Sequence, residues 1–131
     1  MGPTMTIQAH LDTLRRGTAG CQLTAFGDLS SKLILRSSSA AARPREELDN
    51  LCTKAATCFA VLDFETAGNL VGNGHYGNAA IFFTPGKSVI FARPSPETDD
   101  MTCAVIESAQ DVEQALYAVR NTVAQIAEDS Q

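Results

Sequence analysis

The chain has 131 residues, enough for one domain that buries about two thirds of its unfolded surface without needing disulfides. Hydrophobic residues make up 44% and charged residues 19%, a composition typical of folded domains and not of disordered segments or membrane spans. Fifteen acidic residues against ten basic ones give a net charge of −5, which disfavours nucleic acid and anionic lipid as partners.

The N-terminal part of the chain predicts a helix followed by a hairpin. The helix covers residues 6–16, because apolar side chains recur on one face before Gly17, namely Ile7, Leu11 and Leu14. Strand-forming residues then occupy 21–26 and 32–36, with turn residues between them. The segment 37–42 is small and polar, which predicts a loop.

A second helix is the strongest pattern in the sequence. Pro44 followed by Glu46 and Glu47 gives the proline and the acidic residues typical of a first helical turn. One apolar face then continues for about four turns. Its members are Leu48, Leu51, Cys52, Ala55, Phe59 and Leu62. The Gly- and Asn-containing segment 63–77 is predicted to be a connection, and a frayed helix end around Ala67-Gly68 is an alternative for its first part.

Three more strands and a last helix complete the pattern. The strands are predicted at 79–83, 88–92 and 101–106, and their nearly continuous apolar runs indicate a sheet covered by helices on both faces. The last helix opens with Ser108 and Asp111 in an arrangement close to a capping box, and its apolar face comprises Val112, Ala115, Leu116, Val119, Val123 and Ile126. The chain is therefore predicted to be an α+β domain of order α-β-β-α-β-β-β-α with a five-stranded antiparallel sheet.

Nothing in the chain predicts a membrane or secretory address. No stretch reaches the ~18 apolar residues of a transmembrane helix. The first residues lack the basic-then-apolar order of a signal peptide. We therefore expect a cytoplasmic protein without membrane insertion.

No motif in the sequence assembles a catalytic site. Residues 72–77 fit the letters G-x-G-x-x-G, but a helix precedes them and a strand follows, the reverse of what a dinucleotide fingerprint requires. The only two histidines are His10 and His75, and no motif joins either of them to a nucleophile and an orienting carboxylate. We therefore expect no enzyme activity.

The acidic residues and the cysteines are predicted to be structural. The acids of the polar connections are expected to be solvated, namely Asp63, Glu65, Glu97, Asp99 and Asp100. No Cys or His group has zinc-ligand spacing, so the cysteines are expected to be small buried hydrophobes, namely Cys21, Cys52, Cys58 and Cys103. We therefore expect neither a metal nor a cofactor.

Two apolar features favour a second copy of the chain as a partner. They are the strand around 81–83 and the long apolar face of the second helix. If either lies at the margin of the sheet, pairing with a symmetric copy would cover it. Burial of both features inside one monomer is the alternative, and the sequence leaves it open.

In element order and hydrophobic pattern, residues 6–127 resemble the roadblock/dynein light chain domains. The resemblance is carried by the hairpin at 21–36, by Glu46-Glu47-Leu48 at the start of the second helix, and by the final amphipathic helix. It implies one roadblock-like, profilin-like domain over residues 6–128, with flexible termini at 1–5 and 129–131.

The resemblance also implies a homodimer or a heterodimer in which the third strand pairs with its copy and the second helices pack beside each other. The dimer interface would comprise Asn78, Ala79, Ala80, Ile81, Phe82, Phe83, Thr84, Leu51, Ala55 and Phe59. Such a dimer would be a non-enzymatic scaffold that binds or regulates a small Ras-like GTPase, or that tethers a signalling complex.

Two other functions remain as alternatives. A sensory module of the PAS or profilin-like type would bind a small molecule in a cavity lined by His75, Tyr76 and Asn78. A thiol enzyme would use Cys21 or Cys58 as its nucleophile. A sensor would gain thermal stability with one class of metabolite, whereas a scaffold would not.

Overall fold

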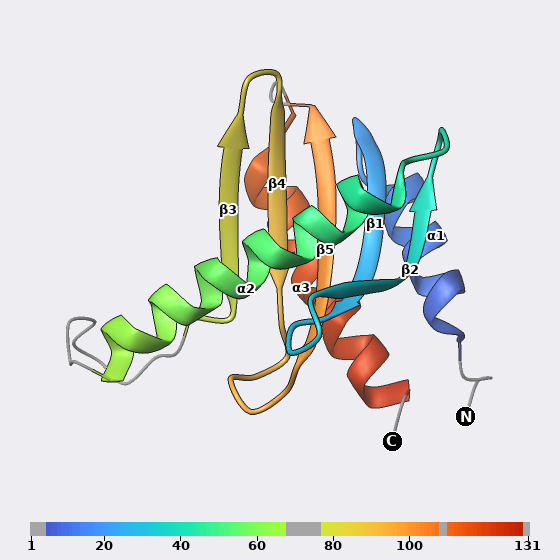
Figure 1. The fold of residues 1–131 in the computed structure, drawn as a ribbon. Coiled ribbons are helices and arrows are strands. Elements are labelled where there is room, and N and C mark those ends of the chain that lie inside the picture. Colours follow the sequence, from blue (N-terminus) through green and yellow to red (C-terminus); the bar gives the residue numbers. More distant parts are fainter. Residues whose placement is uncertain (1–4, 68–76, 108–109, 130–131) are drawn as a thin grey trace.

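The computed structural model describes residues 5–67, 77–107 and 110–129, which form three helices and five strands (Figure 1). The elements are α1 (Ile7–Gly17), β1 (Cys21–Asp28), β2 (Leu33–Ser39), α2 (Arg45–Ala67), β3 (Ala79–Thr84), β4 (Lys87–Ala92), β5 (Asp100–Glu107) and α3 (Val112–Asp129). Their order confirms the predicted succession of helices and strands.

The strands form one antiparallel sheet in the order β2-β1-β5-β4-β3. The last strand of the sequence, β5, lies at the centre, between β1 and β4. Strands β2 and β3 form the two edges. The predicted five-stranded antiparallel sheet is therefore confirmed, and the apolar strand β3 lies at a margin.

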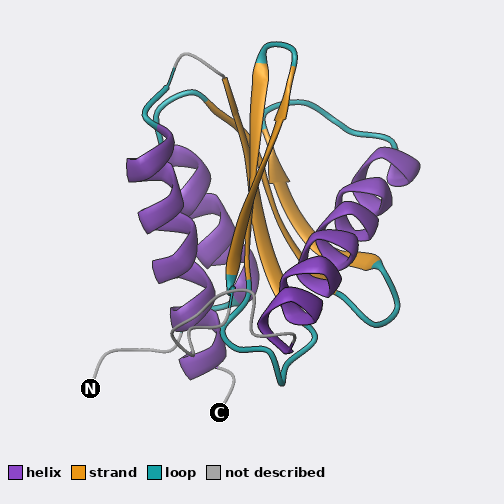
Figure 2. Cartoon of the chain, turned by 90° about the vertical axis from the view of Figure 1, so that its left-hand side faces the viewer, coloured by secondary structure: helices purple, strands orange, loops and turns teal. Residues whose placement is uncertain are grey.

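Helices cover both faces of the sheet, with α2 on one side and the pair α1 and α3 on the other (Figure 2). The core beneath α2 includes Phe59, Phe91 and Met101. The core beneath α3 includes Ile90 and Ile106. Because both faces of the inner strands are buried, β4 and β5 carry apolar residues at consecutive positions instead of alternating ones.

Short polar contacts fix where the first and last helices begin. The Thr6 hydroxyl accepts a hydrogen bond from the Ala9 N–H at 3.1 Å and caps α1. In α3 the Asp111 carboxylate accepts from the Gln114 N–H at 3.2 Å. Asp111 thus caps α3 from the position before its first residue. Ser108, the other half of the predicted capping box, lies outside the described residues.

Two segments predicted to be connections are regular structure. Residues 37–39 continue β2, because they pair in register with β1 as far as Leu23 and Ser39. This pairing overrides the low strand propensity of serine. Residues 63–67 extend α2, and the Asp63 carboxylate there pairs with the Arg93 guanidinium instead of being solvated alone.

The C-terminal boundary also differs from the prediction. Asp129, assigned to a flexible tail, is the last residue of α3, and its carboxylate lies 2.6 Å from Nε2 of His10 on α1. Residues 72–76 of the glycine pattern, with His75 and Tyr76, lie outside the described residues. No helix of the described ranges is long and apolar enough to cross a membrane.

Candidate interaction surface

The two edges of the sheet differ in how their backbone groups are used, and the edge at β2 is closed by side chains. Asp49 accepts a hydrogen bond from the Ile34 N–H at 3.1 Å, and Arg45 donates to the Ile34 carbonyl. Two further carbonyls accept from Arg36 and Gln8, at 2.9 and 3.0 Å. Because these groups already have partners, β2 cannot readily accept another strand.

The edge at β3 is open. The Arg93 N–H donates to the Asn78 carbonyl at 2.9 Å, so Asn78 belongs to a hydrogen-bonded pair with the strand beside it. Alternation along an antiparallel ladder then directs the backbone groups of Ala79, Ile81 and Phe83 outward. Across the described ranges, no hydrogen bond reaches these outward groups. Phe83 is 67% exposed, so the open edge is also apolar.

Helix α2 continues beyond this open edge. It crosses the sheet obliquely from β2, and its C-terminal end extends past β3 (Figure 1). Close packing holds it at the start of β3, where a Cβ on Gly77 would come within 2.8 Å of Leu62 Cδ1. Val61 and Phe64 are 53% and 76% exposed. We call residues 61–64 the overhang of α2, a helical segment in which Val61 and Phe64 are exposed while Leu62 packs on the core.

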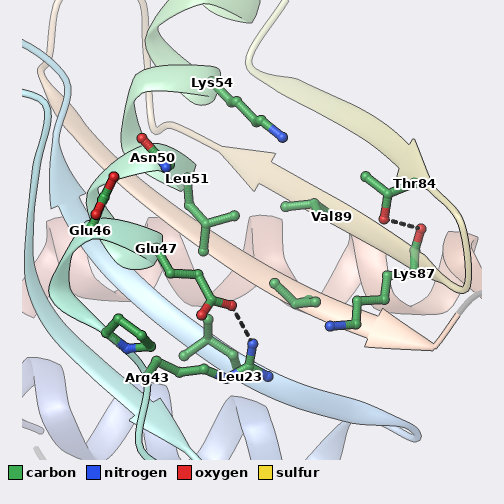
Figure 3. Close-up of a pocket in the computed structure, with 12 residues that line it drawn as sticks. Leu23, Arg43, Glu46, Glu47, Asn50, Leu51, Lys54, Thr84, Lys87 and Val89 are labelled. Atoms are coloured by element: carbon green, nitrogen blue, oxygen red, sulfur yellow. Dashed lines mark hydrogen bonds and ion pairs between the residues drawn. The ribbon is translucent and has the colours of Figure 1, made fainter.

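A groove lies on the same face at the opposite end of β3. It has a volume of about 440 Å³ and separates the first turns of α2 from the β3–β4 hairpin (Figure 3). Its floor is apolar and comprises Leu23, Leu51, Val89 and Val105. Thr84 and Lys87 border it on the hairpin side, where the Thr84 hydroxyl donates to the Lys87 carbonyl at 3.4 Å.

The rim of the groove carries charges of both signs. Arg43 and Glu47 form an ion pair at 2.7 Å. The Lys54 ammonium lies 4.5 Å from the centre of the Phe82 ring, a cation–π contact that neutralises no charge. Among the described residues, neither Lys54 nor Lys87 has an acidic partner in an ion pair. The groove therefore combines an apolar floor with a rim on which Lys54, Lys87 and Glu46 stand outside the Arg43–Glu47 ion pair.

The polar side chains of the opposite end are organised around Arg93, whose side chain is 3% exposed. Its guanidinium donates to the Asp63 carboxylate at 3.1 and 2.5 Å, to the Gly77 carbonyl at 2.8 Å and to the Asn78 amide oxygen at 3.3 Å. The guanidinium carbon lies 4.5 Å from the centre of the Phe59 ring. Asn78, considered above for a ligand cavity, is thus a partner of Arg93.

Burial suppresses the reactivity of three of the cysteines, namely Cys21, Cys52 and Cys103. Burial raises the pKa of Cys52 to about 11 and that of Cys103 to about 12. Cys21 and Cys58 are only half-buried, which differs from the prediction, and burial also raises the pKa of Cys21. A raised pKa lowers the thiolate fraction, so Cys21 is a poor nucleophile. Within the described ranges, no group of three Cys, His, Asp or Glu side chains could hold a metal ion.

The acids around the β1–β2 turn form a second polar group, away from the groove. Hydrogen bonds from the Ser31 and Ser30 hydroxyls hold the pKa of Asp28 below its usual value. Burial, with Asp28 and Asp99 nearby, raises the pKa of Asp100. Asp100 lies half-buried in β5, whereas the sequence predicts that it is solvated.

Comparison with known protein structures identifies the fold. The sequence matches no family model, and no curated protein is similar to it. The structure superposes on the roadblock/LC7 domain from Streptomyces avermitilis with a TM-score of 0.73, at 9% identity, covering 92% of this chain and 94% of that one. The chain has the roadblock/LC7 fold. An MglB structure described as having a tetrameric arrangement gives a TM-score of 0.73 at 17% identity, covering 95% and 90% of the two chains.

The chain also superposes on a profilin. The profilin of Schizosaccharomyces pombe superposes with a TM-score of 0.63 at 12% identity, covering 96% of this chain and 100% of that one. The resemblance stated from the sequence pattern is therefore confirmed at the level of the fold, including its profilin-like character.

Within this roadblock fold, the predicted interface residues fall into two groups. The seven residues from Asn78 to Thr84 form the open edge or lead into it, and Leu51 lines the groove. Ala55 and Phe59 are 0% and 2% exposed and pack on the sheet of their own chain, so they support α2 from beneath. Sequence reasoning missed Val61 and Phe64, although both are apolar residues off the buried stripe. It also missed Arg93, whose main partner lies 30 positions away.

Proposed function

We propose that the chain is a non-enzymatic homodimeric scaffold that binds or regulates a small Ras-like GTPase, or tethers a signalling complex, in the cytoplasm. The observation that carries the proposal is the pairing of an open apolar edge at β3 with a closed edge at β2. One face of the same edge bears both the overhang and the groove. The roadblock/LC7 fold supports the role, because the sequence resemblance to that family implies such a scaffold.

The alternation of inward- and outward-facing backbone groups along β3 determines how two copies would pair. In a two-fold antiparallel pair, outward-facing residues must meet outward-facing residues. Pairing centred on Ile81 meets this condition and uses the whole segment from Asn78 to Thr84. It brings the exposed Phe83 opposite the partner's Ala79, a small residue that leaves room for the ring. The two sheets would then continue as one across both subunits.

The same symmetry would bring the overhang to the groove. Antiparallel pairing sets the Thr84 end of one β3 beside the Asn78 end of the other. The overhang lies at the Asn78 end and the groove at the Thr84 end, on one face of the sheet. Each subunit would therefore lay Val61 and Phe64 over the apolar floor of its partner's groove. Two exposed apolar features would be covered at once, reciprocally.

The GTPase would bind to a surface that the dimer leaves free. The net charge of −5 favours a partner with a basic patch, because complementary charge speeds encounter and selects partners. Helices α1 and α3 lie on the face opposite α2 and would stay exposed in the proposed dimer (Figure 2). Tyr117 on α3 is 74% exposed there and is the kind of aromatic anchor that interfaces use.

Disulfide trapping tests the strand pairing. In the proposed register the Cα atoms of Ile81 and the partner's Ile81 would be about 5.5 Å apart, within disulfide range. Ile81→Cys should therefore form a covalent dimer under mild oxidation. The unsubstituted chain and Leu35→Cys, on the closed edge, serve as controls. Failure of Ile81→Cys to cross-link above these controls would contradict the register.

Two matched variants test the apolar cover. Phe64→Asp should shift the chain to monomer in sedimentation velocity, whereas Tyr117→Asp, equally exposed on the other face, should leave the dimer intact. If both variants or neither dissociate, the overhang has no special role.

A pull-down tests the GTPase. The tagged protein is incubated with native lysate in GDP or in a non-hydrolysable GTP analogue, and retained proteins are identified by mass spectrometry. Enrichment of a small GTPase in one nucleotide state, lost with Tyr117→Asp, is the expected result. A clean dimer that retains no GTPase in either state would overturn this part of the proposal.

A further inference from the structure

Arg93 is the most deeply buried charged side chain among the described residues of this face, and its four side-chain hydrogen bonds compensate for the loss of water. The Asp63 carboxylate receives two of them in a fork, which a planar guanidinium makes and an ammonium cannot. The Phe59 ring covers the guanidinium at 4.5 Å. The geometry of this group is therefore specific to arginine.

The partners of Arg93 come from two separate elements. Asp63 belongs to the overhang of α2, whereas Gly77 and Asn78 lead into β3. Gly77 also packs so closely on Leu62 that a Cβ there would lie 2.8 Å from its methyl group. One side chain thus ties the overhang to the start of the open edge.

We propose that Arg93 is a positioning residue for self-association, which aligns the overhang of α2 with the β3 edge. This inference rests on the proposed homodimer. In that dimer the strand edge and the groove must be engaged together, by two elements of the same chain. An overhang already fixed at the correct angle loses little conformational entropy on association, so alignment before binding strengthens the dimer.

A purely structural role for Arg93 makes a different prediction. If the side chain only stabilised the monomer, its loss would lower the free energy of unfolding and leave the dissociation constant of folded molecules unchanged. A positioning role raises that dissociation constant even where the fold is intact. The dissociation constant, measured on folded protein, therefore separates the two roles.

The experiment compares Arg93→Lys, Asp63→Asn and the double variant with the unsubstituted chain. Asp63→Asn is the milder change, because its side chain is 45% exposed, and it gives the result if Arg93→Lys does not fold. Arg120→Lys, at an exposed position of α3, is the matched control. Far-UV circular dichroism defines a temperature at which each variant is folded, and sedimentation velocity over a concentration series gives the dissociation constant there.

Each single variant should raise the dissociation constant about tenfold, because the fork is lost and the overhang is no longer held. The double variant should be little weaker than either single variant, since both changes break the same contact. Arg120→Lys should match the unsubstituted chain. Folded Asp63→Asn with an unchanged dissociation constant would overturn the assignment of Arg93 and leave the dimer standing. An unsubstituted chain that stays monomeric at every concentration would instead overturn the proposed dimer itself.

Discussion

His10 and Asp129 connect the first helix to the last, with Nε2 of His10 lying 2.6 Å from Oδ2 of Asp129 across 119 positions of sequence. The His10 side chain is 6% exposed, so its ring nitrogen has little access to water and depends on this partner. The contact holds the end of α3 against α1 on the face opposite α2.

Removal of residues 129–131 should therefore destabilise the fold. The buried imidazole would lose its hydrogen-bond partner, which costs about 1–2 kcal/mol of the free energy of unfolding. Urea denaturation followed by circular dichroism measures the change. Removal of 130–131 alone is the control and keeps the contact. Equal stability of the two truncated chains would show that the His10 contact contributes nothing.

The closed edge at β2 predicts a distinct effect for Asp49. Asp49→Ala should lower the free energy of unfolding by about 1 kcal/mol, because the Ile34 N–H loses its acceptor. The exposed edge should also promote association through strand addition, seen as light scattering that rises with protein concentration.

Thr53→Ala is the matched control for Asp49→Ala. Thr53 lies one turn further along α2, is exposed, and its hydroxyl donates only to the Asp49 carbonyl of its own helix. Its loss should change stability by less than about 0.5 kcal/mol and leave scattering unchanged. Comparable scattering from both variants would mean that Asp49 does not protect the edge.

The buried thiols predict a loss of stability at high pH. Their pKa is 9.0 before folding, whereas burial raises the pKa of Cys52 to about 11 and that of Cys103 to about 12 in the folded chain. Above pH 9 the unfolded chain releases these protons and the folded chain keeps them, so the free energy of unfolding falls as pH rises. The contribution is complete below pH 9 and is lost between about pH 9 and 12.

Urea denaturation at pH 8 and pH 10.5 measures this fall. Other groups also titrate in this range, so the comparison is with Cys103→Ala, which lacks one buried thiol. Its free energy of unfolding should fall less steeply between the two pH values. Parallel falls in the two proteins would contradict the role of Cys103.

The hydrophobic periodicity of the sequence predicts most of the fold but little of the interaction surface. The stripe through Leu48, Cys52 and Phe59 predicts α2, because those residues pack on the sheet. The sequence allows a helix end around Ala67, where α2 does end, but not the contact made in the last turns of the helix. In those turns Asp63 pairs with Arg93, a contact between residues 30 positions apart that no local pattern encodes. The open edge required the strand order, which places β3 outside and β5 at the centre.

The serines of β2 show the same limit on a smaller scale. Residues 37–39 have the composition of a loop, yet they pair with β1, and the Ser38 hydroxyl accepts from Arg15 at 2.8 Å. Tertiary partners decided their conformation. Val61 and Phe64 could have been predicted as interface residues from the sequence. Two large apolar side chains outside the buried stripe of a helix indicate a second contact.

The unequal edges of the sheet set a limit on how far the molecule can assemble. Side chains from α1, α2 and β2 itself occupy backbone groups along β2. In the proposed homodimer, the free edge at β3 would be used up by pairing with its own copy. Growth by strand addition would then end after one step, and a rise in protein concentration would fill a finite assembly instead of lengthening a fibre. Any larger complex of that dimer would have to be built through the helical faces, which would leave them as the place for other proteins to bind.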